Sequence, residues 1–264
     1  MNRQPFTVYD IIRIINRKLI AYQAKVIKGA GGETMSTEQP GLFEEIEPES
    51  EAVPEERLVI KPAAAMEPFL AGVELGDAYP EIDDHRQLLE TALKCQRCRL
   101  RGTCKQVVFA DGSPVSRIMF IGEGPGKDED IQGRPFVGRA GQLLDRILEA
   151  ASFNRQEVYI TNVVKCRPPD NRLPNPDEIN LCRGYLEAQI RIIRPAIIVC
   201  LGSLASQVVI DPKARITKIR GQWFQRQGIK IMATFHPAAL LRNEGYKRPV
   251  WEDFKKIRDE YHRL

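Results

Sequence analysis

The 264-residue sequence contains no apolar segment long enough to cross a membrane. Its longest run without a charged residue, 195–210, includes a glycine, two serines and a glutamine, a pattern that indicates a strand, a turn and a helix. The apolar residues near the N-terminus are interrupted by Arg13, Arg17 and Lys18, which is unlike a secretory signal. We therefore expect a cytoplasmic protein without membrane insertion, in a reducing environment that disfavours disulfide bonds.

Charge is distributed unevenly along the chain, although the formal net charge is only +4. Residues 1–30 hold six basic residues and one acidic residue, and 31–84 hold two basic and fifteen acidic residues. The remaining segment, 85–264, holds 31 basic and 19 acidic residues. The chain therefore joins a basic segment of net charge +12 to a strongly acidic one, and the basic segment favours a polyanionic partner.

The acidic segment, 31–84, is rich in Glu, Pro, Gly and Ala and shows no sustained periodicity. Such a composition cannot bury enough apolar surface to offset the entropy of ordering, so we predict a disordered linker. A solvated tether is the simpler interpretation. The alternative is an acidic strip that covers the basic segment and competes with its polyanion, and the sequence leaves both open.

The N-terminal segment, 1–30, is predicted to hold a separate amphipathic helix, because apolar residues between 6 and 28 recur with the spacing of one helix face. An isolated helix of this kind needs a surface to cover its apolar face. We expect that surface to be protein, either the globular segment or an unknown partner, with an anionic membrane as the alternative.

The globular segment, 85–264, alternates short apolar strands with helical patterns, which is typical of a mainly parallel sheet covered by helices on both faces. We therefore predict an α/β fold, a three-layer α/β/α sandwich. The expected strands are 117–121, 158–164, 196–200 and 229–233, and the expected helices are 141–151, 177–193 (capped by Asp177), 203–208 and 251–261.

In such a sheet, ligands bind beyond the carboxyl ends of the strands. Three polar segments are expected to lie at those ends: the glycine-rich turn 122–126, the segment around Asn162, and the segment that contains His236, one of only three histidines. Their convergence predicts a binding crevice there without specifying its chemistry.

The six cysteines differ in their spacing and in the residues around them. Cys200 lies within an apolar strand and is expected to be a buried small hydrophobic residue. Cys95 and Cys98 form a close pair, whereas Cys166 and Cys182 are isolated. Two close and two distant thiols fit either a tetrahedral zinc site or an iron–sulfur cluster, and the lack of a second close pair favours the cluster.

Several ordered motifs make the globular segment resemble the family 4 uracil-DNA glycosylases, the iron–sulfur type found in bacteria and archaea. The resemblance covers about 88–262 and leaves the N-terminal 84 residues outside. The motifs are Cys95-x-x-Cys98, GEGPGKDED (122–130), GRPFVGRAG (133–141), TNVVKCRPP (161–169), Cys182 and HPAALLRN (236–243).

The resemblance implies that Cys95, Cys98, Cys166 and Cys182 hold a 4Fe–4S cluster with a structural rather than a redox role. Cys104 and Cys200 match no ligand position of the family. The family also implies a monofunctional DNA repair enzyme, which hydrolyses the N-glycosidic bond of uracil without a lyase step. Its substrate is uracil-containing DNA in the nucleoid, and we expect a monomer.

The same resemblance predicts a uracil pocket formed by Gly122, Glu123, Gly124, Phe136, Asn162 and His236. An extruded base needs a stacking face, which Phe136 offers, and a reader for its edge. Asn162 can donate to uracil O4 and accept from N3–H, a pattern that cytosine does not match. His236 can donate to uracil O2 as negative charge develops on the leaving base.

Water activation is assigned to a carboxylate near the glycine-rich turn. Family 1 enzymes have an aspartate where this chain has Gly124, so Glu123 is the first candidate and Glu129 the second. Gly126 replaces a bulky residue that excludes thymine in family 1, and Glu129 is a possible substitute for it.

DNA contacts are expected from basic residues in or near the motifs and from two leucines that can fill the gap left by the extruded base. These residues are Arg139, Lys165, Arg167, Leu240, Leu241 and Arg242, with Arg172 nearby.

Three other functions remain as alternatives. A non-catalytic or covalently trapping uracil-DNA binding protein is disfavoured, because the trapping subgroup has Gln at the place of Gly124 and a histidine in a basic loop. Residues 166–172 contain no histidine. An electron carrier would not need Phe136, Asn162 or His236, and a zinc-stabilised DNA-binding module would be colourless.

Overall fold

The computed structural model describes residues 68–70 and 82–264. The predicted N-terminal helix and most of the predicted linker therefore lie outside the described residues. Within them, no helix is long and apolar enough to span a membrane.

A six-stranded mixed sheet forms the centre of the described unit, in the order β1-β3-β2-β4-β6-β5. The four inner strands are parallel, and the two edge strands pair with them in the antiparallel direction. The strands are β1 (Ala110–Gly112), β2 (Ile118–Gly122), β3 (Tyr159–Asn162), β4 (Ile197–Leu201), β5 (Trp223–Arg226) and β6 (Ile229–Thr234). The prediction of a mainly parallel sheet is confirmed, although β1 and β5 were not expected.

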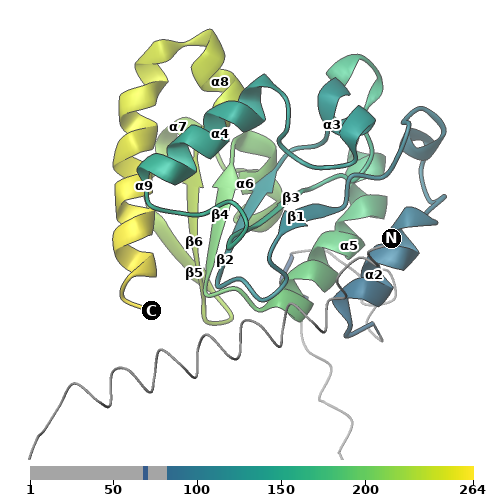
Figure 1. Ribbon diagram of the computed structural model, residues 1–264, viewed down its shortest axis with the longest axis horizontal. Coiled ribbons are helices and arrows are strands. Elements are labelled where there is room, and N and C mark those ends of the chain that lie inside the picture. Colours follow the sequence, from purple (N-terminus) through teal and green to yellow (C-terminus); the bar gives the residue numbers. More distant parts are fainter. Residues whose placement is uncertain (1–67, 71–81) are drawn as a thin grey trace, which may run out of the picture. The chain divides into compact units, whose positions relative to one another are not determined.

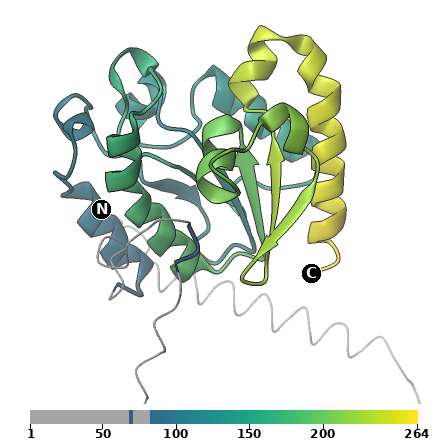
Figure 2. The same ribbon diagram turned by 180° about the vertical axis from the view of Figure 1, so that it is seen from behind.

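Helices cover both faces of this sheet (Figures 1 and 2). Because side chains alternate along a strand, Ile118 and Phe120 of β2 pack in one core, whereas Met119 and Ile121 pack in the other. The α-helices are α2 (His85–Leu93), α3 (Lys127–Gln132), α4 (Arg139–Ala150), α5 (Pro176–Ile193), α6 (Ser203–Val209), α7 (Ile216–Ile219), α8 (Pro237–Arg242) and α9 (Lys247–Tyr261). Within the described ranges the order also includes the 3-10 turns η2 (Arg99–Gly102), η3 (Pro169–Asn171) and η4 (Glu244–Tyr246).

The first core contains residues of α4 and α9, including Leu144 and Ile257. The second contains residues of α2, α5 and α6, including Leu88, Leu186 and Val209. The predicted three-layer α/β/α sandwich is therefore observed.

Two local predictions are wrong. Helix α5 is preceded by Asn175, not capped by Asp177: Pro176 occupies its first turn, the Glu178 carboxylate accepts the Asn175 N–H, and Asp177 pairs with Arg99. The linker prediction also fails at Phe69 and Leu70. Both side chains are buried in the core, and their backbone amides donate to the Glu187 carboxylate at 2.6 and 2.7 Å.

Candidate functional site

A cavity of about 660 Å³ opens at the carboxyl ends of the parallel strands. Glu123 follows β2, Asn162 ends β3, and His236 lies just beyond β6, so three strand ends contribute to its lining as the topology predicts. Phe136, from the loop between α3 and α4, also lines it. Gly124 lines it as well, so the structure brings five of the six predicted pocket residues together.

The Asn162 side chain is buried at the base of this cavity. Among the described residues its Oδ1 atom has no hydrogen-bond partner, which is unusual for a buried acceptor. Gly122 makes the close packing possible, since a Cβ there would lie 2.4 Å from Asn162 Oδ1 and 2.5 Å from Phe136 Cζ. Gly122 thus lies beneath the pocket and does not line it.

His236 packs against Phe136, with the ring centroids 5.4 Å apart. Its Nδ1 accepts the backbone N–H of Ala238 at 3.1 Å, so the proton of the neutral imidazole is on Nε2. Burial, with a smaller contribution from Arg242, lowers the pKa of His236 to about 4. The imidazole is therefore a neutral hydrogen-bond donor at physiological pH.

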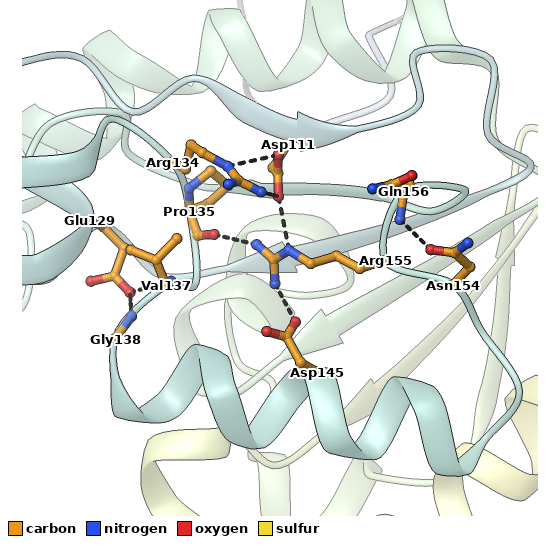
Figure 3. Close-up of polar contacts among 10 residues, drawn as sticks. All are labelled: Asp111, Glu129, Arg134, Pro135, Val137, Gly138, Asp145, Asn154, Arg155 and Gln156. Carbon is orange, nitrogen blue, oxygen red and sulfur yellow. Dashed lines mark hydrogen bonds and ion pairs between the residues drawn. The ribbon is translucent and has the colours of Figure 1, made fainter.

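Phe136 is held in an unfavourable backbone conformation, with a φ of 54°. The Glu129 carboxylate accepts the N–H groups of Val137 and Gly138, both at 2.9 Å, immediately after it. On its other side, Arg155 donates to the Pro135 carbonyl at 2.7 Å (Figure 3). These hydrogen bonds hold the loop on both sides of Phe136 and stabilise its strained backbone conformation.

Arg155 is itself fixed by two carboxylates. Its guanidinium donates to Asp111 at 2.9 Å and to Asp145 at 2.5 Å, and Asp111 also binds Arg134 (Figure 3). Sequence reasoning missed Arg155, because its partners lie 10 to 44 positions away and no local motif marks it.

Glu123 is half-buried at the wall of the cavity. Burial raises the pKa of its carboxyl group, while the Arg242 guanidinium opposes that shift. Glu129, the second candidate for water activation, is occupied by hydrogen bonds to Val137, Gly138 and the Gly126 N–H. Glu123 is therefore the freer of the two carboxylates.

The four cysteines expected to bind metal line a second, small cavity together with apolar side chains such as Leu100 and Val107. Cys104 is not part of that lining, although its thiol contacts Cys166. Among the described residues, no group of three or more His, Cys, Asp or Glu side chains converges on a single ion position.

The donor set of this cavity nevertheless fits an iron–sulfur cluster. Four thiols surround one apolar space, and the Lys165 amide donates to Cys182 Sγ at 3.3 Å, the kind of contact that stabilises a coordinated sulfur. Burial raises the pKa of the Cys182 thiol to about 11, so ligation must displace a proton.

A family model described as the uracil DNA glycosylase superfamily matches residues 109–255. A type-4 uracil-DNA glycosylase of Thermotoga maritima is 47% identical over 175 residues, which are 64% of this chain and 90% of that protein. The type-4 uracil-DNA glycosylase of Sulfurisphaera tokodaii is 43% identical over 67% of this chain and 85% of its own length, and that of Archaeoglobus fulgidus is 40% identical over 64% and 89%.

The chain belongs to the type-4 uracil-DNA glycosylase family. The resemblance inferred from the sequence motifs is thereby confirmed.

Two predicted DNA contacts of this uracil-DNA glycosylase are wrong. Lys165 is only 2% exposed and its ammonium points into the protein, so it cannot reach a phosphate. Leu240 is also 2% exposed and packs in the core, whereas Leu241 on the same helix is 40% exposed. A leucine wedge is therefore available only from Leu241.

The other basic residues for which DNA contacts were predicted lie at the cavity or in the loop after β3. Arg139 and Arg242 are exposed and line the cavity of the glycosylase. Arg167 donates to Asn171 at 2.8 Å, and Arg172 forms a bidentate pair with Glu178. Asn171 lines the cavity too and was not singled out from the sequence, although a polar residue in a proline-rich loop after a strand is a recognisable signal.

Proposed function

We propose that this type-4 uracil-DNA glycosylase receives an extruded uracil in the 660 Å³ cavity and hydrolyses its N-glycosidic bond, leaving an abasic site. The observation that carries the proposal is the buried, unpartnered Oδ1 of Asn162 beside the Phe136 ring. Uracil N3–H supplies the missing donor, and the Asn162 amide group donates in turn to O4. Cytosine has no N3–H, so its binding leaves the acceptor unsatisfied.

His236 and Phe136 complete the pocket in this proposal. The Phe136 ring stacks on the base, and the Nε2–H of His236 donates to O2. A preorganised donor of this kind typically contributes about 3 kcal/mol to transition-state stabilisation, because charge grows on the leaving uracil. The neutral state of His236 does not prevent this, since a neutral imidazole is a full hydrogen-bond donor.

Glu123 is proposed to orient the attacking water through its carboxylate. Glu129 instead holds the Phe136 loop, which agrees with its three backbone partners. Arg139, Arg167, Arg242 and Leu241 are proposed DNA contacts: the arginines meet phosphates and the leucine fills the gap in the stack.

A 4Fe–4S cluster is proposed to be held by Cys95, Cys98, Cys166 and Cys182, as in the family. When bound, the cluster would cross-link the segment after α2, the loop after β3 and α5, and the pocket residues would carry out the chemistry.

The test uses matched oligonucleotides that carry U, T or C at one position, incubated with the iron-loaded full-length protein and then treated with alkali. We expect strand breakage at U only. Intact U strands with the iron present would overturn the proposal, and an adduct that survives denaturation would replace it with the covalent trapping function.

A further inference from the structure

Lys165 is a buried lysine, with only 2% of its surface exposed. Its contacts connect the uracil cavity, through Asn162, with the cysteine site, through Cys182. Its Nζ donates to Asn162 O at 2.6 Å, Thr161 Oγ1 at 2.7 Å and Gln189 Oε1 at 2.6 Å. An ammonium has three N–H groups, so each finds an acceptor. None of the three acceptors is a carboxylate, so their hydrogen bonds do not neutralise the lysine charge.

The acceptors around Lys165 are themselves fixed. Thr161 donates its hydroxyl proton to the Phe109 carbonyl at 2.8 Å, which turns an oxygen lone pair toward the lysine. The Gln189 amide nitrogen donates to Tyr159 OH at 2.9 Å, so its oxygen faces the lysine as well. The cage is therefore preorganised, and a buried charge is tolerated only in such a cage.

The backbone of Lys165 belongs to the cysteine site. The residue immediately precedes Cys166, and its amide donates to Cys182 Sγ at 3.3 Å. Its carbonyl accepts the Val108 N–H at 2.7 Å, which pins the peptide unit. The backbone of Lys165 therefore holds the cysteine loop in place.

Asn162 lies at the other end of this arrangement. It is the last residue of β3, where the strand ladder ends, and the lysine ammonium holds its carbonyl. The same residue lines the uracil cavity, and its Oδ1 is buried without a partner. A shift of its backbone would move the reader amide, and positioning groups tolerate little misplacement.

We propose that Lys165 is a positioning residue: its side chain fixes Asn162 for uracil and its backbone amide holds Cys182, which makes the cysteine loop and the base pocket one unit. The proposal rests on the function proposed above for Asn162. It replaces the phosphate contact that the sequence suggested for this lysine.

The first test is a double-mutant cycle of Lys165→Met and Asn162→Ala, followed by single-turnover excision of uracil from an oligonucleotide. Lys165→Met should slow excision about tenfold or more in the wild-type background, since one positioning hydrogen bond is lost. In the Asn162→Ala background the same change should alter the rate by less than about twofold, because the residue through which it acts is gone. Equal effects in both backgrounds, or no effect in either, would overturn the proposal.

A further readout separates positioning from loss of a DNA contact. The salt dependence of DNA binding by Lys165→Met should keep its slope, whereas loss of a phosphate contact lowers that slope by about 1. A reduced salt slope would contradict the assignment.

Two controls keep the test decisive. Lys213→Met removes an exposed lysine and should leave the excision rate unchanged. If Lys165→Met does not fold, Thr161→Val removes one acceptor at constant shape and should show the same background dependence. Wild-type excision is measured in parallel: its absence defeats the proposed function, whereas normal wild-type excision with an unaffected Lys165→Met defeats only this inference.

Discussion

Glu129 Oε1 lies 2.9 Å from the backbone nitrogen of Gly138, and this hydrogen bond ties α3 to the residue that precedes α4. The same oxygen accepts the Val137 N–H, so the carboxylate closes the loop directly after Phe136. Glu129, which the sequence motifs made the second candidate for water activation, therefore supports the loop that carries the Phe136 ring.

Glu129→Ala should lower the free energy of unfolding by about 2–3 kcal/mol and slow excision, because three backbone amides lose a charged acceptor. Glu129→Gln keeps one side-chain oxygen as an acceptor. Its free energy of unfolding and its excision rate should therefore lie between those of Glu129→Ala and wild type. Chemical denaturation and single-turnover rates check both, with the exposed Glu149→Ala as control. Full stability in both variants together with abolished excision would instead assign Glu129 to water activation.

Asn162→Ala should reduce excision about 100-fold or more while it leaves stability nearly unchanged. The reason is that Oδ1 has no partner in the free protein, so its removal breaks no hydrogen bond of that atom. Single-turnover rates and thermal unfolding measure the two effects, and Asn180→Ala on the exposed face of α5 is the matched control. A variant that cleaves at the wild-type rate would remove Asn162 from the site.

The excision rate should show no inflection from His236 between pH 8 and 6, because its pKa is lowered to about 4. Acid inactivation should instead follow Glu123, whose pKa is raised by burial, and Glu123→Gln should abolish that limb. Single-turnover rates across pH provide the measurement. An inflection near pH 6.5 that disappears in His236→Gln would show that the imidazole titrates normally.

The lowered pKa of His236 should also make the stability of the folded protein depend on pH in a defined direction. The folded-state pKa of His236 is below its unfolded value, so its contribution is complete above about pH 6.5 and declines as the pH falls toward 4. Urea unfolding of wild type and His236→Gln should therefore differ most at neutral pH and converge on acidification. A gap that widens in acid would contradict the assignment.

Serine substitution should distinguish the cysteines. Cys95→Ser, Cys98→Ser, Cys166→Ser and Cys182→Ser should each lose iron and visible absorption, since these four line one cavity. Cys104→Ser and Cys200→Ser, at the two other cysteine positions, should retain both. Iron content and the absorption spectrum measure this, and retention of a full cluster by Cys182→Ser would disprove the ligand set.

The inner strands were predictable because they are continuous apolar runs, which parallel, doubly covered strands require. Ala110–Gly112 and Trp223–Arg226 were not, because they are short or half-exposed and gain their structure from pairing at the sheet edges. Asn162 and His236 could be placed because they lie at or just beyond strand ends, whereas Phe136, in the loop between α3 and α4, was found through the family resemblance.

The direction of individual side chains was less accessible to sequence reasoning. A lysine beside a motif is usually exposed, and Lys165 is buried only because acceptors from residues 161, 162 and 189 enclose its ammonium. Leu240 and Leu241 are equivalent in the sequence, and only the packing of α8 decides that the first faces the core.

The central claim is that Asn162 Oδ1 accepts the N3–H of uracil, and N3-methyluracil tests it directly by removing that donor. Single-turnover excision is compared for uracil and N3-methyluracil in the same oligonucleotide, with wild type and Asn162→Ala. We predict that wild type excises uracil far faster than the methylated base, and that the variant treats the two bases nearly alike. Equal excision of both bases by the wild-type protein would contradict the account.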